Sequence, residues 1–162
     1  MANLDVHFSS KSNEWATPQD FFDRLDSEFR FDLDPCSDGF NAKCERYFTK
    51  EDDGLAQDWH THTRTAVFMN PPYGREIQDW VRKAYEESQK GATVVALIPS
   101  RTDTKYWHDY VMKAKEIRLV KGRLKFGDGK NSAPFPSAVV IFTKHDREFP
   151  LITTMSAKED ET

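Results

Sequence analysis

The sequence predicts a single α/β domain in which a mostly parallel sheet ends in an antiparallel hairpin. Three observations lead to this fold class. The apolar runs 66–69 and 93–98 have the composition of strands covered on both faces, as in parallel sheets. A helical pattern between them supplies the alternation of strand and helix typical of α/β proteins. A last apolar run, 138–142, follows a glycine-containing turn and is expected to return antiparallel to its neighbour.

Length and composition are those of one globular domain. The chain has 162 residues, of which 38% are hydrophobic and 31% charged, and this is enough for a real core. No apolar segment is long enough to cross a bilayer, and the polar N-terminus is not a signal peptide. We expect a flexible arm over 1–13, the domain over 14–145 and a C-terminal tail over 146–162.

The two cysteines, Cys36 and Cys44, show no zinc-binding spacing. A reduced, cytoplasmic setting is therefore expected. His60 and His62 resemble a metal-binding pair, but no third ligand is suggested nearby, so no metal site is predicted.

The first predicted helix begins at Thr17-Pro18, where the threonine can cap and the proline fits the first helical position. Apolar residues then recur at helical spacing, at Phe21, Phe22, Leu25 and Phe29. Helix capping does not explain the tryptophan just before this start, Trp15.

A strand is predicted over 29–34 because apolar and polar residues alternate there. It ends at Asp34-Pro35-Cys36, and open α/β sheets bind ligands at the carboxyl ends of their strands. Asp34 is therefore a candidate ligand for a ribose hydroxyl or a cofactor ammonium group. A turn-forming aspartate before a proline is the alternative.

The segment 41–59 is ambiguous. Residues 47–49 are compatible with a short strand, 50–54 with a turn, and 55–59 with one helical turn.

The most informative stretch is Asn70-Pro71-Pro72-Tyr73, which follows the apolar run 66–69. Two consecutive prolines cannot continue a central strand, and the residue before a proline is held extended, so the strand should end at Asn70. The result is a stiff turn that presents a carboxamide, free carbonyls and an aromatic ring. The Asn70 side-chain oxygen and the Pro71 carbonyl can hold both hydrogens of a nucleobase amine, and Tyr73 can stack on the base. A loop that only ends a strand is the alternative.

The second half continues the alternation. A helix is predicted from Ile77 through Tyr85, with Gly91 as its stop, and another over 106–114. A strand over 117–120 precedes the turn region 122–127 and the final strand.

Charge is unevenly distributed. The net charge is −4, yet residues 101–130 hold nine basic and four acidic residues, a local excess of +5. Phosphate contacts need Lys and Arg, so this segment is the candidate nucleic-acid surface. A solvated mixed surface explains the same pattern equally well.

Taken together, the motifs resemble those of the phage-type DNA N-6-adenine methyltransferases (Dam-like), small S-adenosylmethionine-dependent amino-methyltransferases with a Rossmann-like fold. The resemblance covers about 14–143 and is carried by five segments in matching order: Trp15-Ala16-Thr17-Pro18, Phe31-Asp32-Leu33-Asp34, the segment 53–59, Met69-Asn70-Pro71-Pro72-Tyr73 and Gly122-Arg123-Leu124 with the strand 135–142.

The resemblance implies catalytic residues, a cofactor site and DNA contacts. The implied catalytic residues are Asn70, Pro71, Pro72 and Tyr73. Its S-adenosylmethionine site is drawn from Trp15, Thr17, Pro18, Asp34, Pro35, Cys36 and either Asp53 or Asp58, which the sequence does not separate. Its contacts to double-stranded DNA are drawn from Arg101, Lys105, Arg123, Lys125 and Phe135, the last as a second wall of the base pocket or a plain hydrophobic anchor.

One departure concerns the turn after the first strand. Related cofactor pockets begin with a glycine-rich turn, and Pro35-Cys36-Ser37 stands in its place here. The implied activity is methyl transfer from S-adenosylmethionine to the exocyclic amine of a flipped adenine, in the host-cell cytoplasm if the chain is phage-encoded. The alternatives are another acceptor (cytosine, RNA or a protein glutamine) and a non-catalytic nucleic-acid-binding relative.

Overall fold

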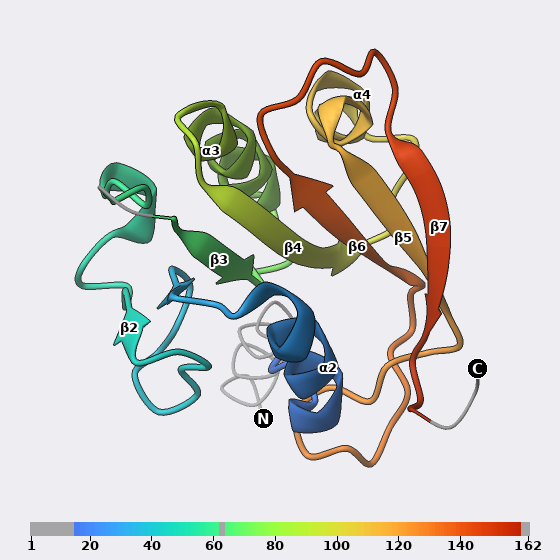
Figure 1. Cartoon of the computed structure of the whole chain (residues 1–162). Coiled ribbons are helices and arrows are strands. Elements are labelled where there is room, and N and C mark those ends of the chain that lie inside the picture. Colours follow the sequence, from blue (N-terminus) through green and yellow to red (C-terminus); the bar gives the residue numbers. More distant parts are fainter. Residues whose placement is uncertain (1–14, 62–63, 160–162) are drawn as a thin grey trace.

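The protein is one seven-stranded sheet with helices on both faces, described over residues 15–61 and 64–159 by a computed structural model (Figure 1). The strand order is β2-β1-β3-β4-β6-β5-β7. The strands are β1 (Leu33–Asp34), β2 (Arg46–Tyr47), β3 (Ala66–Met69), β4 (Thr93–Pro99), β5 (Glu116–Lys121), β6 (Ser137–Phe142) and β7 (Leu151–Ser156). The helices are α2 (Gln19–Phe29), α3 (Ile77–Gln89) and α4 (Lys105–Asp109), with 3-10 turns η1 (Gly54–Ala56) and η2 (Val111–Lys113). The expected arm over 1–13 lies outside the described residues.

The sheet is parallel except for β6. Strands β2, β1, β3 and β4 run parallel to one another, and β7 runs parallel to β5. Strand β6 lies between β4 and β5 and is antiparallel to both. The predicted Rossmann-like α/β fold, mostly parallel with an antiparallel hairpin near its C-terminal end, is therefore confirmed.

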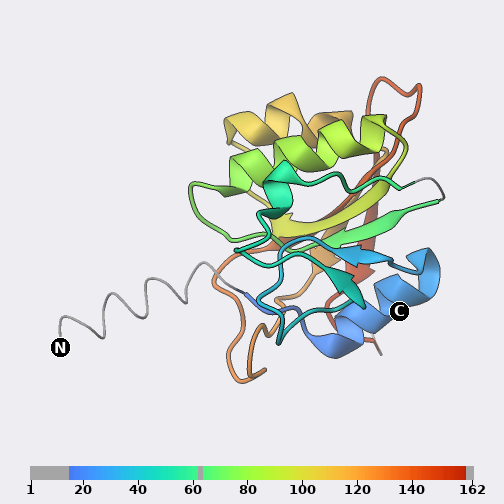
Figure 2. The ribbon, with the colours of Figure 1, turned by 90° about the vertical axis from the view of Figure 1, so that its left-hand side faces the viewer.

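The helices lie in two layers. α3 and α4 cover one face of the sheet, and α2 lies against the other (Figures 1 and 2). Every residue of β3 and β6 is buried, and so is every residue of β4 after Thr93. This explains why these runs lack the alternation of polar and apolar residues that a strand with one exposed face would show. Within the described residues, no helix has both the length and the apolar character needed to cross a membrane.

Two predicted boundaries were wrong. The strand expected over 29–34 is only Leu33–Asp34, because α2 continues to Phe29 and closes with Arg30 in the left-handed region (φ 54°). The Asp26 side chain holds this end by accepting the Phe31 N–H at 2.9 Å. Likewise, the helix expected over 106–114 is a five-residue helix that ends at Asp109, followed by η2.

The segment expected as a C-terminal tail contains a strand. β7 pairs with β5 along its whole length, from Leu151 beside Glu116 to Ser156 beside Lys121. The Thr153 hydroxyl also donates to the Glu116 carboxylate at 2.6 Å. The sheet thus extends past residue 145, the expected end of the domain. The β-branched Ile152, Thr153 and Thr154 were the available signal.

Candidate active site

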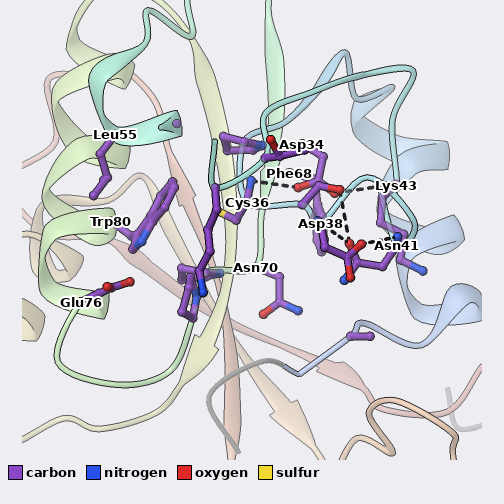
Figure 3. A pocket seen from close by; sticks show the side chains of 18 of the residues that line it. Asp34, Cys36, Asp38, Asn41, Lys43, Leu55, Phe68, Asn70, Glu76 and Trp80 are labelled. Atoms are coloured by element: carbon purple, nitrogen blue, oxygen red, sulfur yellow. Dashed lines mark hydrogen bonds between the residues drawn. The ribbon is translucent and has the colours of Figure 1, made fainter. Parts of the chain in front are cut away.

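A cavity of about 480 Å³ lies where β1 and β3 end, which is the expected position of a ligand site in an open α/β sheet. Leu55, Glu76 and Trp80 stand on one side of it (Figure 3). Asp34, Asp38, Asn41 and Lys43 stand on the other, with Cys36 and Asn70 between the two sides. Residues 15–17 complete the lining beside Asn70.

At the end of β1, the Asp34 carboxylate holds its own loop together. One oxygen accepts the Cys36 N–H at 3.2 Å and the other accepts the Lys43 N–H at 3.0 Å. The side chain is only 5% exposed. Burial raises the pKa of Asp34 above 3.8, and the bonds from Lys43 and Cys36 offset only part of this rise. Asp34 therefore shapes the cavity by fixing residues 34–43.

The rest of this loop is also fixed by short polar side chains. The Asn41 oxygen accepts the Ser37 hydroxyl at 3.2 Å and the Asp38 N–H at 3.1 Å. Asp38 in turn accepts the N–H groups of Phe40 and Asn41, each at 2.8 Å. These bonds give the glycine-poor turn a defined shape. Burial raises the pKa of the Cys36 thiol, so the side chain presents a neutral surface to the cavity.

At the end of β3, the Asn70 carboxamide is held from one side only. Its Nδ2 donates to the Trp15 carbonyl and, at 2.9 Å, to the Thr17 hydroxyl. Because a carbonyl oxygen can only accept, the contact with Trp15 decides which end of the carboxamide is nitrogen. Asn70 Oδ1 is buried and has no hydrogen-bond partner. A buried polar atom without a partner is costly in a folded protein, so this oxygen points to a missing ligand.

Thr17 therefore acts differently from the prediction. α2 begins at Gln19 with Pro18 as its cap residue, and no side chain caps its first turn. The Thr17 hydroxyl accepts from Asn70 instead. The expected capping role was wrong because a distant partner binds this oxygen.

Tyr73 lies in an aromatic cluster beside the cavity. Its ring meets Phe126 and Phe135 edge-to-face, with centroids 6.2 and 5.5 Å away, and Trp15 packs on the same two rings. The Tyr73 hydroxyl donates to the Leu97 carbonyl at 2.9 Å, and the residue is 9% exposed. Phe135 thus stands beside Tyr73, as a second wall of a base pocket would, but the rings contact one another.

The cavity collects most of the residues expected at the cofactor. Trp15, Thr17, Asp34, Pro35, Cys36 and Asp53 line it together with Asn70, Pro71 and Pro72. Pro18, Asp58 and Tyr73 do not. Asp58 instead faces Lys90 at 3.6 Å on the surface. Of the two aspartates that the sequence left open, the structure puts Asp53 at the cavity.

Sequence reasoning missed the wall formed by η1 and α3. Leu55 and Trp80 supply its apolar part, and Gly54 allows it to approach β1 closely. A Cβ at Gly54 would lie 2.3 Å from the Pro35 carbonyl oxygen and 3.0 Å from the Trp80 ring, so a larger residue cannot fit. In the sequence, only Gly54 within the motif 53–59 indicated this close approach of the η1 wall to the end of β1.

Acidic residues dominate the cavity lining. Six carboxylates stand against two ammonium groups: Asp34, Asp38, Glu51, Asp53, Glu76 and Asp79 against Lys43 and Lys50. The cavity therefore favours a ligand that carries positive charge. No cluster of three or more possible metal ligands occurs among the described residues, and His62 lies outside them.

The expected DNA contacts lie outside the cavity. Arg101, which follows β4, is exposed, and so are Lys105, Arg123 and Lys125. Lys105 pairs with Asp109, and Arg123 donates to the Ala133 carbonyl at 3.2 Å. The loop 122–136, which carries the last two of these cations, joins the segment next to Asn70 through the Gly127 N–H and the Ala16 carbonyl (2.9 Å).

A Rossmann-like sheet with a carboxyl-end cavity and an Asn-Pro-Pro-Tyr corner defines the class as a methyltransferase. The family described as DNA N-6-adenine-methyltransferase (Dam) matches residues 7–162. The chain belongs to this family.

Two phage relatives agree with the family assignment. The DNA N-6-adenine-methyltransferase of Haemophilus phage HP1 is 30% identical over 141 residues, covering 82% of this chain and 80% of that one. A protein of the same description from Escherichia phage T1 is 27% identical over 111 residues, covering 68% of this chain and 45% of its own. Among solved structures, "a predicted O-methyltransferase" from Agrobacterium tumefaciens has a TM-score of 0.37 at 20% identity, covering 68% of this chain and 53% of that one.

Proposed function

We propose that the protein transfers a methyl group from S-adenosylmethionine to the exocyclic N6 amine of an adenine in double-stranded DNA. The observation that carries the proposal is Asn70 Oδ1, a buried, unpaired acceptor at the edge of the cavity. Family membership and the phage relatives support DNA as the substrate.

The donor fits the cavity by size and by charge. About 480 Å³ is within the range of cofactor sites, roughly 300 to 1,000 Å³. The acidic lining suits a sulfonium cation, and the apolar side formed by Leu55 and Trp80 suits a purine ring. When bound, S-adenosylmethionine would supply an electrophilic methyl group: the amine nitrogen forms the new N–C bond, the C–S bond breaks to leave a neutral thioether, and the amine releases one proton to water, so no metal is required.

Asn70 and Pro71 provide the acceptors for the target amine. An adenine amine is a weak nucleophile because its lone pair is delocalised into the ring. Asn70 Oδ1 and the Pro71 carbonyl can accept its two hydrogens, which favours a tetrahedral nitrogen whose lone pair points at the methyl group. Trp15 and Thr17 accept hydrogen bonds from Asn70 Nδ2 and so fix the carboxamide before the substrate arrives, which means that Oδ1 needs no reorientation during transfer.

The target base has to leave the DNA helix to reach this corner. Tyr73 is the residue to stack on it, and Phe135 is a candidate for the opposite face. Because the two rings pack together, entry of a base requires Phe135 or Phe126 to move away from Tyr73. Both lie at buried positions of the loop 122–136, whose cations Arg123 and Lys125 can contact phosphates as this movement occurs.

The test is the identity of the product. The purified chain is incubated with methyl-labelled S-adenosylmethionine and double-stranded DNA, which is then digested to nucleosides for mass spectrometry. We expect N6-methyladenine with the wild type and at least about a hundredfold slower transfer with Asn70→Ala. Label on cytosine, or only on RNA or protein, would reassign the acceptor.

Donor binding is measured separately by calorimetry. Asp53→Asn should weaken S-adenosylmethionine binding. Asparagine tolerates the left-handed backbone at this position (φ 55°), so the substitution should not disturb the fold. Asp58→Asn, outside the cavity, is the matched control and should bind as the wild type does. A wild type that binds DNA but no donor would favour a non-catalytic relative.

A further inference from the structure

We propose that Glu87 of α3 is a positioning residue for the methyl donor: it holds Trp59, and Trp59 holds the apolar wall of the cavity. The inference rests on the proposed function, because the donor is the ligand that this wall would contact. Glu87 is not among the residues that line the cavity. Its side chain is fully buried, which is rare for a carboxylate and requires partners inside the protein.

The Glu87 carboxylate binds the backbone of a distant segment. Its Oε1 accepts the Trp59 N–H at 2.7 Å, across 28 residues of the sequence. Lys83 Nζ lies 3.1 Å from the same oxygen, and Lys90 Nζ lies 3.1 Å from Oε2. Burial alone would raise the pKa of Glu87, but the Trp59 N–H and the two lysines hold it below 4.5. An ionised acceptor therefore holds Trp59, and hydrogen bonds to ionised groups are stronger than those between neutral groups.

Trp59 contacts the cavity wall in two ways. Its indole Nε1 donates to the Gly54 carbonyl at 2.8 Å, which ties it to η1. Its ring stacks on Trp80, with the centroids 6.2 Å apart and the planes inclined by 23°. Trp59 is fully buried, so water does not compete for either contact. Leu55 of η1 and Trp80 of α3 line this side of the cavity (Figure 3), and they are the side chains suited to a purine ring.

The spacing along α3 explains how Trp59 meets two of its side chains. Trp80 and Glu87 are separated by almost two full helical turns, so both project from the same face of α3. Without Glu87, the buried Trp59 N–H would lose its partner, and Trp59 would have to move to find another. Because Gly54 packs tightly against Pro35 at the end of β1, such a movement would alter the shape of the cavity.

The Asn70 carboxamide is held by a different set of contacts. Its nitrogen donates to the Trp15 carbonyl and the Thr17 hydroxyl, which belong to the segment before α2. Glu87 acts on the opposite side of the cavity, through Trp59 and η1. Its effect should therefore fall on donor binding and leave the transfer step almost unchanged.

Calorimetry and steady-state kinetics on the full chain test the inference. Glu87→Met removes the acceptor for the Trp59 N–H at a similar side-chain length. We expect the dissociation constant and the KM for S-adenosylmethionine to rise at least about tenfold, while kcat at saturating donor stays within about twofold. Glu87→Gln keeps an oxygen for this N–H and should restore most of the donor binding.

A second variant and a control separate this role from a general loss of stability. Trp59→Phe keeps an aromatic ring but removes the Nε1–H that binds Gly54, and it should also weaken donor binding. Glu86→Met makes the same substitution one residue earlier in α3, at an exposed side chain, and should bind the donor as the wild type does. Urea denaturation checks that each variant is folded.

The outcomes distinguish this inference from the proposed function. A wild type that binds the donor and transfers its methyl group, with unchanged binding in Glu87→Met and Trp59→Phe, would overturn this inference alone. A fall in kcat without a rise in KM would also overturn it. A wild type that binds no donor would overturn both. If Glu87→Met does not fold, Trp59→Phe decides by the same criteria.

Discussion

Two corners of this protein look alike in sequence and differ in what they leave unpaired. β1 ends at Asp34-Pro35 and β3 ends at Asn70-Pro71, on neighbouring parallel strands that open onto one cavity. Both oxygens of Asp34 accept backbone N–H groups of its own loop. Asn70 is held through its nitrogen by a different part of the chain, and its oxygen has no partner.

This difference distinguishes a side chain that stabilises the fold from one that can bind a substrate. A polar side chain whose hydrogen-bonding capacity is used within the protein stabilises the fold, and its removal leaves other groups unpaired. A side chain with a buried, unused acceptor contributes little stability and retains the capacity to bind a substrate. Both kinds of residue can stand at the carboxyl end of a strand, so position alone does not distinguish them.

The largest expected effect is on the reaction rate of Asn70→Ala. We expect kcat for methyl transfer to fall at least about a hundredfold, because the acceptor aimed at the amine is lost. The free energy of unfolding should change by less than about 1 kcal/mol, since the variant loses two hydrogen bonds but also an unpaired buried oxygen. Transfer assays and urea denaturation measure the two quantities. A large loss of stability would show that Asn70, like Asp34, mainly stabilises the fold.

Asp34→Asn should show the opposite pattern. Its NH2 group has to face the N–H of Cys36 or Lys43, which leaves that N–H unpaired and costs about 1 to 3 kcal/mol of stability. The pKa of Asp34 is raised in the folded protein. The contribution of Asp34 to the free energy of unfolding therefore falls as the pH rises from 3.8 through the raised value. The variant should lack this part of the pH dependence in denaturation experiments.

Thr17→Val tests the support of Asn70. The substitution keeps the side-chain shape and removes the acceptor for Nδ2, while the Trp15 carbonyl still holds the carboxamide. We expect kcat to fall about fivefold, the equivalent of one hydrogen bond of roughly 1 kcal/mol. Thr17→Ser retains the hydroxyl and should restore the rate. An unchanged rate in Thr17→Val would show that Trp15 alone positions Asn70.

The smallest effect concerns Glu116, whose Oε2 accepts hydrogen bonds from two side chains, Arg118 and Thr153, instead of from backbone N–H groups. Burial alone would raise its pKa, but hydrogen bonds from Arg118 and Thr153 lower it below 4.5. Its contribution to stability is therefore present above pH 4.5 and lost as the pH falls through the lowered value. Glu116→Gln should cost about 1 kcal/mol or less at pH 7, and the difference from wild type should disappear in acid.

Much of the fold followed from local chemistry. Residues 66–69 and 94–98 are apolar throughout and form buried strands, and β3 ends at Met69, one residue before the end that the two prolines after Asn70 predict. β7 was missed because an edge strand is defined by its pairing partner, and its own residues are half exposed. The short β1 was overestimated because Arg30 ends the helix in a conformation that is uncommon for a non-glycine residue.

By itself, the sequence determined that a rigid turn with a carboxamide follows a buried strand, because proline restricts the backbone wherever it stands. Only the tertiary structure decided which atom of that carboxamide remains available. The decision depends on Trp15 and Thr17, which are more than fifty residues away in the chain and meet Asn70 only after the sheet has formed. The choice between Asp53 and Asp58 is of the same kind, since it depends on which of them faces the cavity.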